Sequence, residues 1–499
     1  MSPQHDVIVV GGGIGCLCAA IILGAAGLNV LLLESDSMLG GKAAQIEREG
    51  IAMDTGPSVL TLPGAFESVF GAVGLRFEDE VPLHRPSPAF RYIYSGGPTL
   101  DVFHEVDRTI ESVRSTLGSR AAQELADYLA HAERIWAAAE PHFVTRAAPS
   151  LRTLIGGGWA AWKNLGTIDP FRTMVQTINH KVKDPHIGTL LKRYATYNGS
   201  DVRRAPGTLG CIAHVELSLG GFGVKGGMYC LVEALERALW RAGVAVELSA
   251  HVTRICVEDG VVSGAELADG RLLRARQVVF GGDARALESG LLGEVPSRLS
   301  PTDPSMSAHT FLFKASDQQQ PRVAHTVIFP PRYEQEFEDI FDHRRVPAHP
   351  TIYACDQRQC HLRASWPSHS PLFAMVNAPA LAPDYDGGPD PELMAQVQAG
   401  LARQGLIAQG DPCLWWRTPR DLAVRFTASQ GSLYGSSSNG MMAAFRRPSN
   451  TSSVRGLFLA SGSAHPGGGL PMVAQSGKLA AQAALRQRSN SFSKESAGS

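Results

Sequence analysis

Two glycines near the N-terminus have the spacing of a dinucleotide-binding turn. The apolar residues 5–10 predict a buried strand, and Gly11 and Gly13 follow it directly. Residues 16–26 predict a helix, and a second apolar strand ends in Glu34. In such a unit the first glycine permits a tight turn, the second lets the backbone approach a pyrophosphate, and the helix N-terminus offers free N–H groups. The carboxylate can accept hydrogen bonds from ribose hydroxyls.

One position departs from this pattern. Cys16 stands at the third small position, where glycine or alanine is usual, and cysteine is small enough to pack there. After Glu34 the chain has two further groups of turn residues, Gly40-Gly41-Lys42 and Asp54-Thr55-Gly56-Pro57. An NAD domain would usually continue with another strand and helix. These turns therefore favour a loop over a longer cofactor, FAD.

Glycines return near the C-terminus. Residues 457–461 predict a buried strand, residues 462–469 a loop, and Pro471 suits the first turn of a helix. That helix would point its N–H groups and the positive end of its dipole at the loop. Between the two glycine regions, a predicted helix from Gly226 and a hairpin that turns at Asp259-Gly260 extend the same domain.

Four further stretches carry a family resemblance. They are MDTGPSVLT at 53–61, RYATYNGS at 193–200, KGGM at 225–228 and ASGSAHPGGGLPM at 460–472. With them the chain resembles the carotenoid desaturases of the phytoene desaturase superfamily over nearly its whole length. Residues 193–197, 337–341 and Pro471-Met472 are most similar to the hydroxycarotenoid 3,4-desaturases, also called methoxyneurosporene dehydrogenases.

The resemblance implies an α/β fold with two domains. The first is a Rossmann-like FAD-binding domain of the glutathione-reductase type, and a mixed α+β substrate domain is inserted into it. We expect the FAD-binding domain to comprise residues 1–80, 208–290 and 440–487. The substrate domain, which would face the membrane, would comprise residues 81–207 and 291–439. The polar residues 488–499 predict a disordered tail.

The motifs and the resemblance together imply a set of FAD contacts. The C-terminal loop and helix would lie against the diphosphate and the flavin, and the backbone near Val252 against the adenine. Where many related flavoenzymes have Gly-Asp, this chain has Gly462-Ser463, so one familiar carboxylate contact is absent. The expected contacts are Gly11, Gly13, Ile14, Gly15, Glu34, Ser35, Gly41, Lys42, Gly56, Pro57, Ser58, Val252, Gly462, Ser463, Gly469, Leu470, Pro471 and Met472.

The resemblance also implies a reaction. It is the FAD-dependent introduction of a carbon–carbon double bond into an acyclic carotenoid, as 3,4-desaturation of a 1-hydroxy- or methoxy-carotenoid in carotenoid biosynthesis. The flavin accepts a hydride, so a proton must also leave. His465, Tyr197, His214 and Glu216 are candidates for handling that proton or for holding the polar end of the substrate. For each of them, a role in packing or hydrogen bonding is the alternative. The electron acceptor, oxygen or a quinone, stays open.

Other functions on the same scaffold remain alternatives. They are a phytoene- or lycopene-type desaturase, a carotenoid oxidase or isomerase, and a flavin amine oxidase. A different class of protein, a prenyl-lipid-binding protein that has lost its flavin, would keep this fold without catalysis. The intact Gly11, Gly13 and Glu34 count against that class.

Charge and hydropathy limit the partners and the location. Lys and Arg number 46 and Asp and Glu 47, which leaves a net charge of -1 and no basis for binding nucleic acid. Residues 7–33 carry no charge and are long enough to span a bilayer, but their central glycines indicate strand, turn and helix instead. We therefore expect a cytoplasmic enzyme, attached peripherally to the membrane surface that holds its lipophilic substrate.

The eight cysteines form no dense pattern. Cys355 and Cys360-His361 contain ligand types for a metal, but four residues separate the two cysteines and no second Cys/His pair with zinc spacing follows. We therefore expect ordinary thiols and no metal site.

Overall fold

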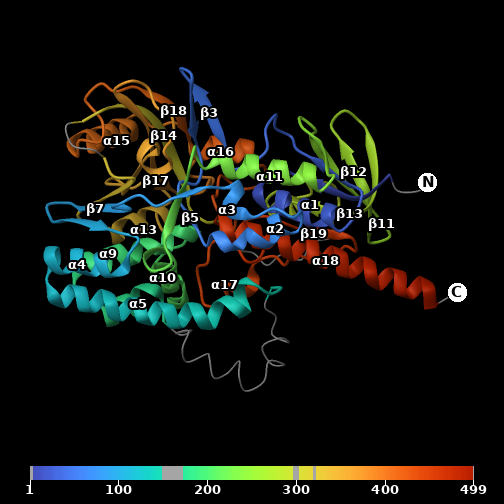
Figure 1. Ribbon diagram of the computed structural model, residues 1–499, viewed down its shortest axis with the longest axis horizontal. Helices are drawn as coiled ribbons and strands as arrows, with labels where there is room; N and C mark the ends of the chain where they lie inside the picture. The colour runs from blue at the N-terminus through green and yellow to red at the C-terminus, as the bar shows by residue number, and fades with distance from the viewer. Residues whose placement is uncertain (1–3, 149–171, 296–302, 319–321, 498–499) are drawn as a thin grey trace.

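Two sheets lie at opposite ends of the molecule (Figure 1). The computed structural model describes residues 4–148, 172–295, 303–318 and 322–497. The first sheet has the strand order β10 (Ala245–Glu247), β2 (Val30–Leu33), β1 (His5–Val10), β13 (Leu272–Phe280), β12 (Val261–Leu267) and β11 (Val252–Glu258), with β19 (Leu457–Leu459) beside β13.

The centre of the first sheet is parallel. β1 lies between β2 and β13, and β19 continues the parallel arrangement beyond β13. β2 is buried along its whole length and β1 over its last four residues, which is why both are continuous apolar runs. The carboxyl ends of β1, β2, β13 and β19 meet at one edge of the sheet, where a doubly wound fold binds its ligand.

Three helices complete this half of the molecule. α1 (Ile14–Ala25) packs between α11 (Tyr229–Arg241) and α18 (Leu470–Ala497). Both termini lie at the end of the molecule that holds the first sheet (Figure 1). α1 and α18 approach each other closely at two glycines. A Cβ added to Gly477 would lie only 2.1 Å from the carbonyl oxygen of Gly15.

Cys16 is accommodated by a glycine opposite it. Its side chain is fully buried, and a Cβ built on Gly281 would lie only 2.2 Å from its sulfur. Gly281 follows β13 directly, and because it has no side chain, the thiol of Cys16 can pack against its backbone. The unusual residue at the third position of the turn is therefore compensated across the interface between helix and strand.

The second sheet is mostly antiparallel. Its order is β18 (Cys413–Arg417), β14 (Ser307–Ser316), β17 (His369–Ala378), β16 (Ile352–Asp356), β15 (His325–Phe329), β7 (Phe90–Tyr94) and β8 (Thr99–Val102), and only β15 and β7 pair in parallel. Apolar residues of α15 (Pro391–Arg403) pack on one part of this sheet. A second core joins β7, β8 and β15 to the helices α4 (Val106–Leu117), α5 (Ser119–Ala139), α8 (Met174–Lys181), α9 (Pro185–Lys192), α10 (Ile212–Leu217) and α13 (Glu334–Phe341).

Short elements connect the two halves. β9 (Gly221–Val224) pairs with β5 (Leu60–Thr61) and β6 (Leu83–His84), and β3 (Gln45–Arg48) pairs with β4 (Ile51–Asp54). The remaining short helices are α2 (Glu67–Gly71), α3 (Phe77–Glu80), α12 (Arg285–Glu288), α14 (Gln357–His361), α16 (Pro419–Arg425) and α17 (Ala443–Arg446). The first sheet takes its strands from the segments expected to bind FAD and the second from those expected to hold the substrate, while the domain boundaries themselves stay a prediction.

The prediction of a disordered tail is wrong for residues 488–497, because α18 continues to Ala497. A helix that is already nucleated gains a hydrogen bond with each added residue, which offsets the low helix propensity of this polar segment. Arg488 also pairs with Asp6 at 2.8 Å. Residues 498 and 499 lie outside the described residues.

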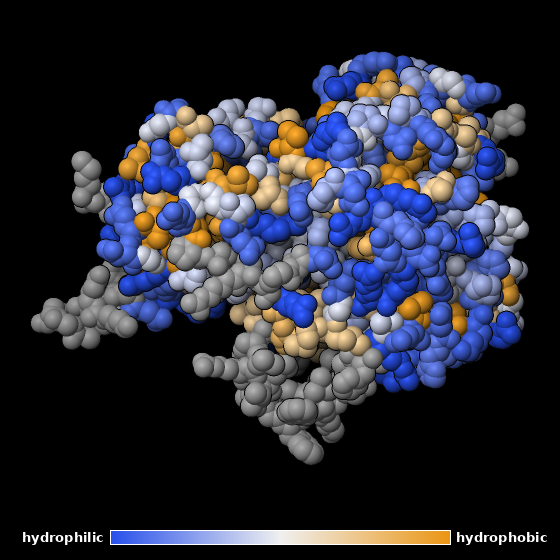
Figure 2. Space-filling view, turned by 180° about the vertical axis from the view of Figure 1, so that it is seen from behind, coloured by the Kyte–Doolittle hydropathy of each residue, from blue (hydrophilic) through white to orange (hydrophobic). Residues whose placement is uncertain are grey.

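The surface and the helices bear on the expected membrane location. On the face shown in Figure 2, hydrophobic residues form small patches between hydrophilic ones. No helix among the described residues combines the length and the apolarity that crossing a membrane requires.

Candidate active site

One cavity of about 1020 Å³ extends from the carboxyl edge of the first sheet to the second sheet. Every residue that the sequence assigns to FAD lines this cavity, from Gly11 to Met472. Of the four candidates for proton handling, Tyr197 and His465 line it, whereas His214 and Glu216 do not.

The N-terminal turn presents backbone to the cavity. Gly11 has a φ of 106°, which a residue with a side chain rarely adopts. A Cβ on Gly13 would meet no protein atom within 4 Å, so its missing side chain leaves open space. Gly13 also caps α1, and no side chain satisfies the first N–H groups of that helix. An anion placed there would accept those N–H groups and face the positive end of the helix dipole.

Glu34 is held at the side of this turn. One carboxylate oxygen accepts the N–H of Gly12, and the other accepts the hydroxyl of Ser35 at 3.0 Å and the N–H of Asp36 at 2.8 Å. The carboxylate therefore fixes the turn and still lines the cavity, where a ribose would meet it.

The C-terminal loop closes the same end of the cavity. A Cβ on Gly469 would meet no protein atom within 4 Å, and its φ of 96° favours glycine. Ser463 accepts the N–H of Ala284 at 2.9 Å, so the hydroxyl that replaces the usual carboxylate holds two loops together. Open space at both glycine turns, a carboxylate at the ribose position and an uncapped helix fit FAD.

Two cationic side chains in the cavity wall donate hydrogen bonds to backbone carbonyl oxygens of nearby loops. Lys42 donates to the carbonyl oxygens of Ser432 and Leu433 at 2.9 and 2.8 Å, and burial lowers its pKa to about 8. Arg447, which the sequence gave no reason to select, donates to Gly462 at 3.0 Å, and burial lowers its pKa to about 10. Arg447 also donates to the carbonyl oxygen of Tyr434 at 3.3 Å, so both cations hold residues 432–434 near the glycine motifs.

His465 is a neutral group fixed to the backbone. Its Nε2 lies 2.9 Å from the carbonyl oxygen of Arg146, and burial lowers its pKa. Because that oxygen can only accept, Nε2 carries the proton. His465 therefore lies in the cavity wall as a hydrogen-bond donor that is already occupied.

The opposite end of the cavity contains a buried arginine among aromatic rings. The guanidinium of Arg193 lies 5.0 Å from the ring centre of Tyr197 and 5.6 Å from those of Phe90 and Tyr92. It also donates to the hydroxyl of Tyr92 at 3.2 Å. Arg193 and Tyr197 both line the cavity. The motif at 193–200 contains both residues, but only Tyr197 was selected from it as a candidate site residue.

Glu216 stands behind these two residues. It accepts the hydroxyl groups of Tyr194, at 2.9 Å, and of Tyr197, and it lies 3.8 Å from Arg193. Burial raises the pKa of Tyr197, which keeps its hydroxyl neutral. Glu216 therefore positions Tyr197 and balances the charge of Arg193 without facing the cavity. His214, two residues earlier, is not brought to the cavity, because α10 places it elsewhere.

The structure also assembles three residues that sequence spacing did not connect. Pairing of β15 with β16 sets His325 opposite Cys355, and Cys360 lies beside both. The expectation of no metal site rested on the distance along the chain between ligand types. In the fold, these residues lie close together although His325 is far from the two cysteines in sequence.

A Rossmann-like sheet with a cradle for FAD, in a cavity that continues to the second sheet, defines a flavin-dependent oxidoreductase. A family model for flavin containing amine oxidoreductases matches residues 16–485, and the chain belongs to this family. The predicted fold class, the cofactor FAD and the oxidoreductase class are thereby confirmed.

Relatives within the family are similar over nearly their whole length. The chain is 35% identical to a hydroxyneurosporene desaturase of Rubrivivax gelatinosus, with 96% of this chain and 93% of the relative covered. It is 33% identical to a hydroxyneurosporene desaturase of Rhodobacter capsulatus, with 98% and 99% covered. A 4,4'-diapolycopene oxygenase of Methylomonas is 28% identical, with 96% and 97% covered.

Solved structures agree in fold. A triple mutant of putrescine oxidase has a TM-score of 0.64 at 14% identity, with 97% of this chain and 99% of that one covered. Cyclohexylamine oxidase from Brevibacterium oxydans IH-35A has a TM-score of 0.59 at 15% identity, with 98% and 100% covered. At such identities the likeness concerns the fold alone.

Proposed function

We propose that this protein is an FAD-dependent carotenoid desaturase that introduces the 3,4 double bond into an acyclic carotenoid with a 1-hydroxy or methoxy end group. The identity of 33–35% to hydroxyneurosporene desaturases over nearly the whole chain supports it. The observation that carries the proposal is one cavity with a backbone cradle at one end and the Arg193–Tyr197 pair at the other. Bound FAD supplies the two-electron acceptor.

The two ends of this cavity suit a substrate with one polar terminus. Arg193 has five N–H donors, and the hydroxyl of Tyr92 uses one of them. The donors that remain can bind a hydroxyl or a methoxy oxygen. The hydroxyl of Tyr197 donates its hydrogen bond to Glu216, so its oxygen can accept a hydrogen bond from a substrate hydroxyl. Such a site rejects an analogue without the oxygen more strongly than an apolar wall can.

Side chains near one rim of the cavity support attachment to a membrane surface. Met441 lines the cavity and is 38% exposed, and its neighbour Met442 is 44% exposed. Both precede α17, whose residues Ala443 and Ala444 line the cavity as well. A lipid-dissolved substrate needs an apolar mouth of this kind. Release from membranes by carbonate is the expected result, and release by detergent alone would contradict peripheral attachment.

The test of the proposed function is a comparison of substrates. FAD-loaded protein is given 1-hydroxyneurosporene and phytoene separately, and the polyene absorption is followed. We expect only the hydroxylated carotenoid to shift to longer wavelength. Conversion of phytoene alone would identify a phytoene-type desaturase, and an oxygenated product would identify an oxygenase. A purified protein without flavin absorption would leave only the lipid-binding alternative.

A further inference from the structure

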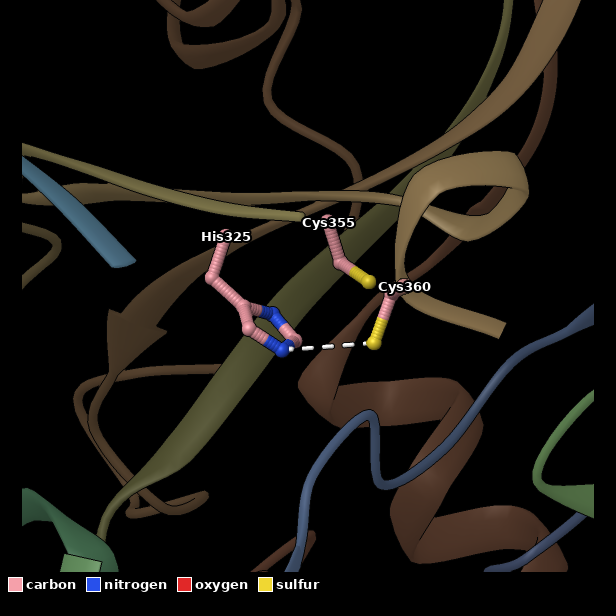
Figure 3. Close-up of side chains that lie close together, drawn as sticks. All are labelled: His325, Cys355 and Cys360. Atoms are coloured by element: carbon pink, nitrogen blue, oxygen red, sulfur yellow. Dashed lines mark hydrogen bonds between the residues drawn. The ribbon is translucent and has the colours of Figure 1, made fainter. Parts of the chain in front are cut away.

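Two cysteines and a histidine meet where the second sheet is followed by a short helix (Figure 3). His325 on β15 and Cys355 on β16 are partners in the strand register, and Cys360 lies on the short helix α14 that follows. The imidazole and thiol atoms of the three lie within 4.8 Å of one another. Each residue is at most 1% exposed.

The spacing of these atoms suits a tetrahedral metal ion. The sulfur of Cys360 lies 3.3 Å from Nε2 of His325. Zinc bonds of about 2.3 Å to sulfur and about 2.0–2.1 Å to nitrogen, at a tetrahedral angle, separate the two ligand atoms by about 3.5 Å. An ion would therefore require a shift of only tenths of an ångström between Cys360 and His325, and the sulfur of Cys355 lies within 4.8 Å of both ligand atoms (Figure 3).

The imidazole of His325 is oriented as in a metal site. Its Nδ1 lies 2.8 Å from the hydroxyl of Tyr353, which can accept the Nδ1 proton and leave the Nε2 lone pair facing the sulfurs. His361, the neighbour that sequence alone would pair with Cys360, is excluded as a ligand. Its Nδ1 accepts the N–H of Val224 at 3.1 Å, so its Nε2 carries a proton in the neutral ring.

We propose that Nε2 of His325 and the sulfurs of Cys355 and Cys360 bind one Zn²⁺ ion. Two thiolates, a neutral imidazole and Zn²⁺ sum to zero charge, which a water-free site requires. A monovalent soft ion such as Cu⁺ would leave a buried negative charge. Binding replaces the protons of both thiols, so two protons leave for each ion bound.

The role of this ion is structural. The sulfur of Cys360 lies 3.6 Å from the carbonyl oxygen of Ser58, which is the nearest candidate for the fourth ligand that the contacts show. Ser58 and Tyr353 both line the cavity, whereas the three ligands do not. The ion would thus tie the loop after β4 to the second sheet and fix this part of the cavity wall.

The test begins with the intact FAD-loaded protein from zinc-supplemented cultures. Elemental analysis should find about one zinc ion per chain, as structural zinc sites bind tightly. Cys355→Ala and Cys360→Ala should each remove it. Cys413→Ala, which changes a thiol on β18 of the same sheet, should keep it. Flavin content and the unfolding midpoint of each sample show whether the variant folds.

A titration makes the test independent of those variants. Zinc-free wild-type protein in weak buffer should take up one equivalent of Zn²⁺ with release of two protons, and Co²⁺ should give d–d absorption bands to the red of the flavin. Absence of zinc from the purified protein together with no uptake would overturn the proposal. Uptake that Cys355→Ala leaves unchanged would overturn it too. A disulfide that involves Cys355 or Cys360 in the denatured, unreduced protein would overturn it as well, since a disulfide cannot bind the ion.

Discussion

The two ends of the cavity are built from different materials. Around Gly13 and Gly469 the wall is backbone, and the missing side chains themselves make the space for FAD. Around Arg193 and Tyr197 the wall is side chains that pack in from separate strands and helices. A site made by backbone tolerates almost no change of residue type, whereas a site made by side chains can change its ligand while the fold stays. We therefore expect substitutions at the first end to abolish flavin binding and those at the second to alter stability and substrate choice.

The largest effect on flavin binding is expected at the backbone end. Gly13→Val would place a branched side chain where the pyrophosphate must lie, and its Cβ would meet no protein atom within 4 Å. The variant should fold and lose FAD by at least about tenfold in affinity, which corresponds to about 1.4 kcal/mol. Flavin titration measures this, and Gly71→Ala, another open position, is the matched control. Flavin binding equal to wild type would refute the backbone cradle.

At the other end, Arg193→Met should leave FAD bound but weaken the fold. It leaves the Glu216 carboxylate buried without its cationic neighbour, which costs about 3–5 kcal/mol when such a pair is broken. The unfolding midpoint should fall clearly, and Glu216→Gln in the same chain should recover part of the loss. If the double variant is no more stable than Arg193→Met, the two groups do not balance each other.

A third variant tests how the turn accepts its cysteine. Gly281→Ala places a methyl group 2.2 Å from the sulfur of Cys16, and overpacking of this kind costs about 1–3 kcal/mol. Cys16→Ala in the same chain should restore much of that loss, because the nearest atoms left to the new methyl are then the carbonyl oxygen of Val10 at 3.2 Å and the Cβ of residue 16 at 3.5 Å. Urea unfolding of the single and double variants measures the coupling. Additive losses would mean that the two positions do not compensate.

The smallest effect concerns pH. Burial lowers the pKa of Lys42 to about 8 from its ordinary 10.5, so between these values the unfolded chain binds more protons than the folded one. Raising the pH through this window therefore stabilises the folded, flavin-free protein through Lys42. Lys42→Met should remove that gain. The difference in unfolding free energy between wild type and variant is measured at pH 7 and pH 9.5. A difference that does not change with pH would contradict the lowered pKa.

The same contrast explains what sequence could predict. The turn at Gly11 and Gly13 is local, so strand, glycines and helix were recognisable from their order along the chain. Arg193 packs against rings on other elements as well, such as Tyr92 on β7, and no spacing rule joins it to them. Packing likewise hid the match between Cys16 and Gly281. Residues 488–497 were mispredicted because composition alone does not register a helix that has already begun upstream.

The central claim is that Tyr197 serves the polar end of the substrate while the glycine turns serve FAD. Tyr197→Phe removes one hydroxyl from the cavity wall and keeps the ring beside Arg193. The measurement is kcat/KM of this variant for 1-hydroxyneurosporene and for the same carotenoid without its hydroxyl group. We predict an unchanged flavin content and a ratio of the two values that falls by up to about tenfold, the worth of one hydrogen bond. An equal loss for both carotenoids, or no loss for either, would contradict the account.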